Sequence, residues 1–126
     1  MEDRYLFKAK HIHVLPDNNH LDGSWVVGFL SGERYIANDS GEYLIDPSTI
    51  CRCTGSEDKN GELIYENDIM KNKHNSYRVV WDNEEGSWML ELNSVSLYGL
   101  SEVNSKKYEV IGNIFDNPEL LRRNEE

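Results

Sequence analysis

Cysteine is scarce in this sequence, with two residues among 126. Cys51 and Cys53 lie one residue apart, which makes a poor disulfide framework and matches no standard zinc-binding spacing. On a strand their side chains begin roughly 6.6 Å apart, so two sulfurs reach one zinc ion only if the backbone bends. We therefore expect two reduced thiols, as in a cytoplasmic protein.

Long apolar runs are also lacking. No stretch approaches the roughly 18 consecutive apolar residues that a transmembrane helix needs. The first residues, 1–4, lack the basic and then apolar layout of a signal peptide. We expect a cytoplasmic protein that has no membrane partner.

Basic residues are in the minority, since 13 Lys and Arg face 23 Asp and Glu and the formal net charge is −10. Non-specific nucleic-acid binding depends on Lys and Arg that neutralise phosphates, so direct binding to nucleic acid is not expected. The same charge disfavours anionic lipid, keeps a protein soluble and favours a basic partner.

The apolar residues that are present come in short runs separated by turn-forming residues, a pattern typical of short strands. The sequence predicts a mostly β fold, either a small barrel or a sandwich of short antiparallel strands. A cap residue, a proline and a basic end predict a short C-terminal helix over 117–123. The length fits a single domain over 1–126, in which an N-terminal lobe 1–54 and a C-terminal lobe 60–121 are conceivable.

A hairpin gives the clearest local pattern. Tyr77, Val79 and Trp81 alternate onto one face of a strand, and the polar residues 83–86 form the turn. The return strand spans 88–92 and has the same alternation. Our first interpretation is that the tryptophans of both strands pack into the core.

Three other segments have weaker patterns. Residues 55–61 are polar and predict a loop with Gly61 at positive φ. Residues 93–106 fit either a short helical turn or an irregular strand. Residues 108–115 are apolar and predict a strand that bends at Gly112.

Acidic residues gather in two segments, 57–68 and 82–91. If the segments adjoin, their carboxylates form a negative face that fits a basic groove on another protein. A solvated surface that resists aggregation is the alternative. Tyrosine and methionine are enriched at binding surfaces, so we add exposed candidates of both types. The candidate partner-binding residues are Glu57, Asp58, Glu84, Glu85, Met89 and Tyr98.

No catalytic signature accompanies these residues, because neither a G-x-S-x-G pattern nor a phosphate-binding loop occurs. His11 and His13 share a predicted strand face and, with the two cysteines, form a set that we weighed as a zinc site against a purely structural role. Residues 57–62 are rich in oxygen ligands, but the position six after Gly61 is Asn67 and not the glutamate of a calcium loop. We predict no enzyme, no catalytic residue, no metal and no cofactor.

Two segments resemble the YopX family of phage and prophage proteins. The first runs from Thr54-Gly55 through DKNGELIYENDI at 58–69, and the second is EVIGNIFDNPELL at 109–121. Residues 25–30, 45–49 and 79–82 fit the same pattern. The resemblance therefore covers nearly the whole chain in order.

The chain departs from that family at Asn67, where Gly is usual, and at Arg52 and Cys53, where Gln and an aromatic residue are common. Because Asn tolerates positive φ, we expect the turn at Asn67 to be kept. The resemblance implies a mostly β domain and a phage or prophage origin, and it implies no activity. The matching residues resemble a fold signature that shapes turns, buttresses strand starts and caps the last helix: Asp58, Asn60, Gly61, Tyr65, Asp68, Gly112, Asn113 and Pro118.

Together these observations favour a non-catalytic accessory protein in the cytoplasm of a host bacterial cell that binds a host or phage protein. One alternative is an acidic nucleic-acid mimic that inhibits a host defence or DNA-handling protein. Another is a nucleic-acid-binding β-barrel, which needs a basic stripe from Arg4, Lys8, Lys10 and Arg34 with Tyr5 or Phe7. Edge strands leave a homo-oligomer open.

Overall fold

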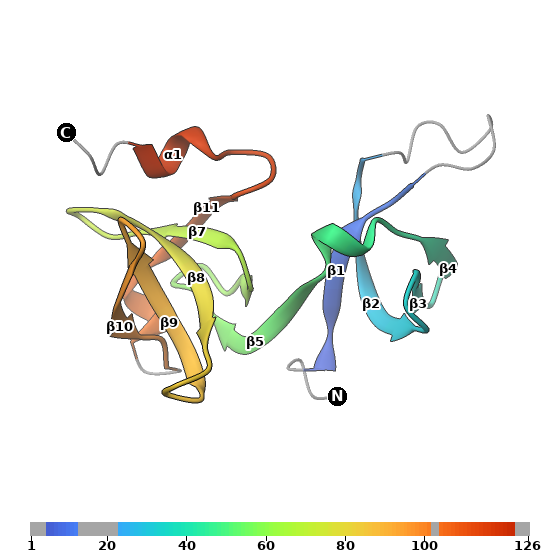
Figure 1. Ribbon diagram of the computed structural model, residues 1–126, viewed down its shortest axis with the longest axis horizontal. Coiled ribbons are helices and arrows are strands. Elements are labelled where there is room, and N and C mark those ends of the chain that lie inside the picture. The colour runs from blue at the N-terminus through green and yellow to red at the C-terminus, as the bar shows by residue number, and fades with distance from the viewer. Residues whose placement is uncertain (1–4, 13–22, 102–103, 123–126) are drawn as a thin grey trace. The chain divides into compact units, whose positions relative to one another are not determined.

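The computed structural model describes residues 5–12, 23–101 and 104–122 (Figure 1). The chain divides into two compact units, Met1–Cys53 and Thr54–Glu126. Each unit contains its own cluster of buried hydrophobic residues. The boundary lies beside the end of the predicted N-terminal lobe, and the assignment of one domain to the whole chain stays a prediction.

Short antiparallel strands build the N-terminal unit. Its elements are β1 (Phe7–Lys10), β2 (Trp25–Ser31), β3 (Tyr35–Asn38), β4 (Gly41–Leu44), the 3-10 turn η3 (Pro47–Thr49) and the start of β5 (Cys51–Glu57). The strand order is β4-β3-β2-β1-β5. Asp46 caps the start of η3, because its carboxylate accepts a hydrogen bond from the backbone amide of Ser48 at 3.0 Å.

Gly28 marks the point at which β2 changes its neighbour. β1 pairs with residues 25–28 of β2, whereas β3 pairs with residues 29–31. A Cβ atom on Gly28 would clash with the backbone oxygen of Ala37. The absence of a side chain therefore lets β3 approach the backbone of β2 closely.

The core of the N-terminal unit follows the alternation of β1. Ala9 is fully buried with Ile36 and Ile45, and Phe7 packs against the same cluster. Because alternate residues point to opposite faces, the lysines of β1 lie on the other face of the sheet. Partly buried Val26 and Ile50 complete the cluster.

The C-terminal unit contains a second antiparallel sheet and the helix. After β5 come β6 (Leu63–Tyr65), β7 (Asp68–Lys71), β8 (Ser76–Asp82), β9 (Ser87–Leu92), β10 (Val95–Gly99), the 3-10 turn η4 (Ser105–Lys107), β11 (Glu109–Asn113) and α1 (Glu119–Arg122). The sheet order is β10-β9-β8-β7-β11, and β6 is the neighbour of β5.

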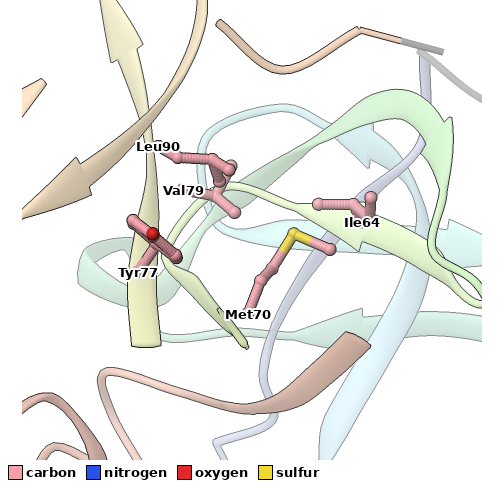
Figure 2. Close-up of a cluster of buried hydrophobic side chains, with 5 residues drawn as sticks. All are labelled: Ile64, Met70, Tyr77, Val79 and Leu90. Atoms are coloured by element: carbon pink, nitrogen blue, oxygen red, sulfur yellow. The ribbon is translucent and has the colours of Figure 1, made fainter. Parts of the chain in front are cut away.

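Figure 2 shows the core of this unit, whose side chains come from β6, β7, β8 and β9. Tyr77, Val79 and Leu90 are buried as the alternation of the predicted hairpin requires, and β8 pairs with β9 through Val79 and Leu90. Met70 and Ile64 complete the cluster from β7 and β6. The two hairpin tryptophans pack edge to face, with ring centroids 5.2 Å apart.

The prediction of a mostly β fold with short antiparallel strands and a short C-terminal helix is confirmed. In the residues that the structure describes, the strand orders are open at both ends, so neither sheet closes as a barrel. The predicted loop over 55–61 is wrong in its first part, since β5 continues to Glu57. The ambiguous segment 93–106 contains the strand β10 and the start of the short turn η4.

Three smaller predictions about the backbone are confirmed. Gly61 and Asn67 both have positive φ, at 82° and 71°. The register of β11 against β7 shifts between Val110 and Gly112, as expected for a bend there. The sequence predicts that Asn117 caps the C-terminal helix. Its side-chain oxygen instead accepts a hydrogen bond from the backbone amide of Asn113, in the preceding turn, at 3.2 Å.

Candidate functional site

Asp58 does not belong to a surface, so its prediction as an exposed contact is wrong. The residue is 1% exposed. Its carboxylate accepts backbone N–H groups of Asn60 at 2.8 Å, Glu62 at 2.9 Å and Val110 at 2.9 Å. A carboxylate with three such donors holds a turn together, and this confirms the turn-shaping role implied by the family resemblance.

Glu57, the neighbour of Asp58, stays exposed at the end of β5. Its carboxylate lies 3.5 Å from the ammonium group of Lys106. An exposed ion pair of this kind contributes little to stability, but it reduces the negative charge that a partner would meet.

Glu84 and Glu85 are exposed at the tip of the β8–β9 hairpin. The carboxylate of Asp82 accepts their backbone amides at 2.9 and 3.1 Å, and this shapes the turn. Of the two predicted contacts on the following strands, Tyr98 is 49% exposed and packs edge-on against Tyr77. Met89 is half-buried, with its sulfur 3.7 Å from the hydroxyl of Ser87.

The acidic segments are largely occupied by structural roles. Asp68 is buried and accepts the amide of Tyr65 at 2.8 Å, and Glu91 lies 3.9 Å from the guanidinium of Arg78. With Asp58 and Asp82 also engaged in turns, the exposed carboxylates of the two segments are fewer than the sequence suggests. That reduction weakens the basis for a continuous negative face.

A second surface lies in the N-terminal unit; of its residues the sequence indicates only Lys8 and Lys10, as part of a basic stripe. We call it the N-terminal face; it consists of Lys8, Lys10, Trp25, Val27, Phe29 and Tyr35. The strand registers place these residues on one side of β1, β2 and β3, because Lys8 is opposite Val27 and Lys10 is opposite Trp25.

Three apolar side chains of this face are open to solvent. Val27 and Phe29 are each 40% exposed, and Tyr35 is 41% exposed. The run 25–30 is apolar throughout, which in a sequence is typical of a strand buried on both faces. The alternation of lysines on β1 was the signal that could have shown one face to be open.

Two lysines add positive charge to the N-terminal face around Trp25. The ammonium groups of Lys8 and Lys10 lie 4.7 and 5.5 Å from the centroid of its ring. Such cation–π contacts hold long side chains over an aromatic surface and contribute about 0.5–1 kcal/mol at exposed sites. The face therefore combines apolar contact area with two positive charges.

A hollow of about 330 Å³ lies beside the first half of β2, where β3 does not pair. Asn38 lines this hollow, and its side-chain amide donates a hydrogen bond to the carbonyl oxygen of Val27 at 2.8 Å. Its lining consists of Ser24, Trp25, Val26, Val27, Asn38 and Tyr43. A partner side chain of moderate size fits a hollow of this volume.

The residues weighed as a zinc site do not converge in the described part of the chain. There, no group of three or more His, Cys, Asp and Glu residues is placed to hold a metal ion. His11 is buried with its ring edge-on to Tyr43, and both cysteines are buried. His13 lies outside the described residues.

Comparison with known proteins decides the family. The model of the family described as YopX protein matches residues 17–122. The chain belongs to the YopX family. A search of curated proteins found no match to this YopX chain. Within 5–12, 23–101 and 104–122, no helix is long and apolar enough to cross a membrane.

Proposed function

We propose that this YopX chain is a non-catalytic accessory protein, encoded by a phage or prophage, that binds a host or phage protein in the host cytoplasm. The observation that supports this most is the exposure of Val27, Phe29 and Tyr35 together on the N-terminal face. Neighbouring exposed apolar side chains are typical of interaction surfaces, because a partner gains about 25 cal/mol per Å² of apolar area that it covers.

The chemistry of the face favours a protein partner of a particular kind. An apolar side chain would cover Val27 and Phe29, and a carboxylate would reach the lysines beside Trp25. Nucleic acid fits less well, since the whole chain carries −10 and repels a phosphate backbone.

The mimic remains a second candidate, because Glu84 and Glu85 are exposed side by side at one hairpin tip. Two neighbouring carboxylates can contact a basic groove even when the rest of the acidic segments is engaged elsewhere. The two functions use different units of the chain, so variants separate them.

Affinity capture from host lysate, with nuclease treatment and mass spectrometry, tests the proposal when it is run on matched variants. We compare the wild type with Phe29→Ser, with the double variant Glu84→Lys/Glu85→Lys and with Tyr98→Ser. Tyr98→Ser tests the exposed candidate that the sequence predicted in the C-terminal unit. Circular dichroism confirms that each variant is folded.

A protein that is captured by the wild type and by Tyr98→Ser, and lost with Phe29→Ser, supports binding through the N-terminal face. Loss with the Glu84/Glu85 variant alone transfers support to the mimic. Capture that is identical for all four proteins, or material that disappears with nuclease, contradicts the proposal. Light scattering of the purified protein shows whether a second copy occupies the face instead.

A further inference from the structure

Four lysines surround one pocket in the C-terminal unit, and neither the family nor the proposed function accounts for them. The pocket has a volume of about 460 Å³. Its lining consists of Lys59, Lys71, Asn72, Lys73, Lys107 and Glu109. These residues come from the turn after β5, the end of β7 with its following turn, and the junction of η4 with β11.

The backbone around this lysine pocket is held by hydrogen bonds between the segments. The amide of Lys59 donates to the carbonyl oxygen of Tyr108 at 3.0 Å, and Lys71 is paired with Glu109 in the ladder of β7 and β11. The buried carboxylate of Asp58 fixes the same turn to Val110. The backbone that carries the lysines is therefore ordered before a ligand binds, which reduces the entropy lost on binding to that of the side chains.

The turn that carries Lys73 is shaped by Asn72. The side-chain oxygen of Asn72 accepts the amides of His74 and Asn75, both at 2.9 Å. Its backbone amide donates to the carbonyl oxygen of Asn75 at 3.1 Å. This local network keeps Lys73 beside Lys71 on the rim of the pocket.

The lining has an excess of positive charge. Four lysines and one glutamate leave a formal charge of +3, and the single carboxylate lies 3.9 Å from Lys59. The ammonium groups repel one another and all attract an anion, so the cluster is stabilised when an anion enters. Because the whole chain carries −10, the remainder of it carries −13, since +3 and −13 sum to −10.

We propose that the lysine pocket binds a small phosphate-bearing molecule that carries two or more negative charges. Lysine ammonium groups bind phosphate as point charges. A cluster of several ammonium groups therefore matches a diphosphate better than it matches a ligand with a single carboxylate. The volume is in the range of small-molecule sites. The strongly negative remainder of the chain repels an extended polyanion, which favours a small ligand over nucleic acid.

Calorimetric titration at low ionic strength tests this site with pyrophosphate as the probe, in the full-length protein. The variant is Lys71→Gln/Lys73→Gln, and the matched control is Arg34→Gln/Lys106→Gln, whose residues are exposed and belong neither to the pocket lining nor to the N-terminal face. We expect the wild type and the control to bind pyrophosphate equally, and the pocket variant to bind about tenfold more weakly or worse. A second pocket variant, Lys59→Gln/Lys107→Gln, gives the same loss from different segments if the first one is poorly folded.

Several results overturn the proposal. One is the absence of pyrophosphate binding to the wild type, and another is equal weakening in the control. A third is a single-stranded oligonucleotide that binds more tightly than pyrophosphate, which would assign the lysines to nucleic acid. The inference is independent of the proposed function, because Phe29 lies in the other unit and does not line the lysine pocket.

Discussion

The Oδ2 atom of Asp58 accepts a hydrogen bond from the backbone amide of Val110 at 2.9 Å, across 52 positions of the sequence. The other oxygen of the same carboxylate accepts two amides of its own turn. One buried side chain thus shapes a local turn and joins it to the last strand of the C-terminal unit. It also positions the turn that carries Lys59.

Asp58→Ala is expected to lower the free energy of unfolding by about 3 kcal/mol, because three backbone N–H groups lose the charged acceptor that Asp58 supplies from a buried position. Urea unfolding followed by circular dichroism measures the change. Asp58→Asn is the control for size, and it should lose less because its amide keeps one acceptor oxygen. An alanine variant as stable as the wild type would contradict the role given to this carboxylate.

Gly28→Ala is expected to destabilise the protein by about 2 kcal/mol, since the new methyl group meets the carbonyl oxygen of Ala37 and either strand must shift. Gly99→Ala is the matched control, because a Cβ atom there has no atom within 4 Å. The control should remain within about 0.5 kcal/mol of the wild type in the same urea experiment. Equal effects of the two substitutions would show that close packing at Gly28 is unimportant.

At Asn67 two effects oppose each other. Its φ of 71° favours glycine, while its side-chain oxygen accepts the Nε and Nη2 atoms of Arg78 at 3.2 and 2.9 Å. Asn67→Ala loses the hydrogen bonds to Arg78 and keeps the unfavourable positive φ. We therefore expect the free energy of unfolding to fall by about 1–2 kcal/mol. Asn67→Gly should be more stable than the alanine variant by about 1 kcal/mol, since glycine relieves the strain. Thermal unfolding of both variants decides the order, and the reverse order would refute this explanation.

Tyr108 is expected to make stability depend on alkaline pH. Burial raises the pKa of its hydroxyl above the ordinary 10.0, Tyr77 and Tyr98 raise it further, and a hydrogen bond with Asn72 lowers it. The folded state therefore keeps this proton at a pH where the unfolded state releases it. The resulting stability is fully present below the ordinary pKa and is lost as the pH rises through the raised pKa.

The measurement is urea unfolding of the wild type and of Tyr108→Phe across this alkaline range. The wild type should lose more free energy of unfolding than the variant as the pH rises, since phenylalanine has no proton to release. Parallel pH profiles for the two proteins would show that the environment of Tyr108 makes no contribution. Phenolate absorbance of the folded proteins gives the raised pKa directly.

Local chemistry explains which features the sequence predicted. The alternation in 77–81 and 88–92 placed the hairpin, and the tolerance of Asn67 and Gly61 for positive φ placed two turns. Asp58 shows the limit of such reasoning. A carboxylate in a polar stretch looks exposed in a sequence, because its partner Val110 is far away along the chain.

The sequence by itself determined a mostly β protein with many short strands, a terminal helix, an acidic balance and membership of the YopX family. These properties depend on residue type and on spacing over a few positions. Only the tertiary structure decided which face of β2 is exposed to solvent and which lysines line one pocket. Both depend on strand pairing, in which the neighbours Lys8 and Val27, or Lys71 and Glu109, are set by register between distant segments.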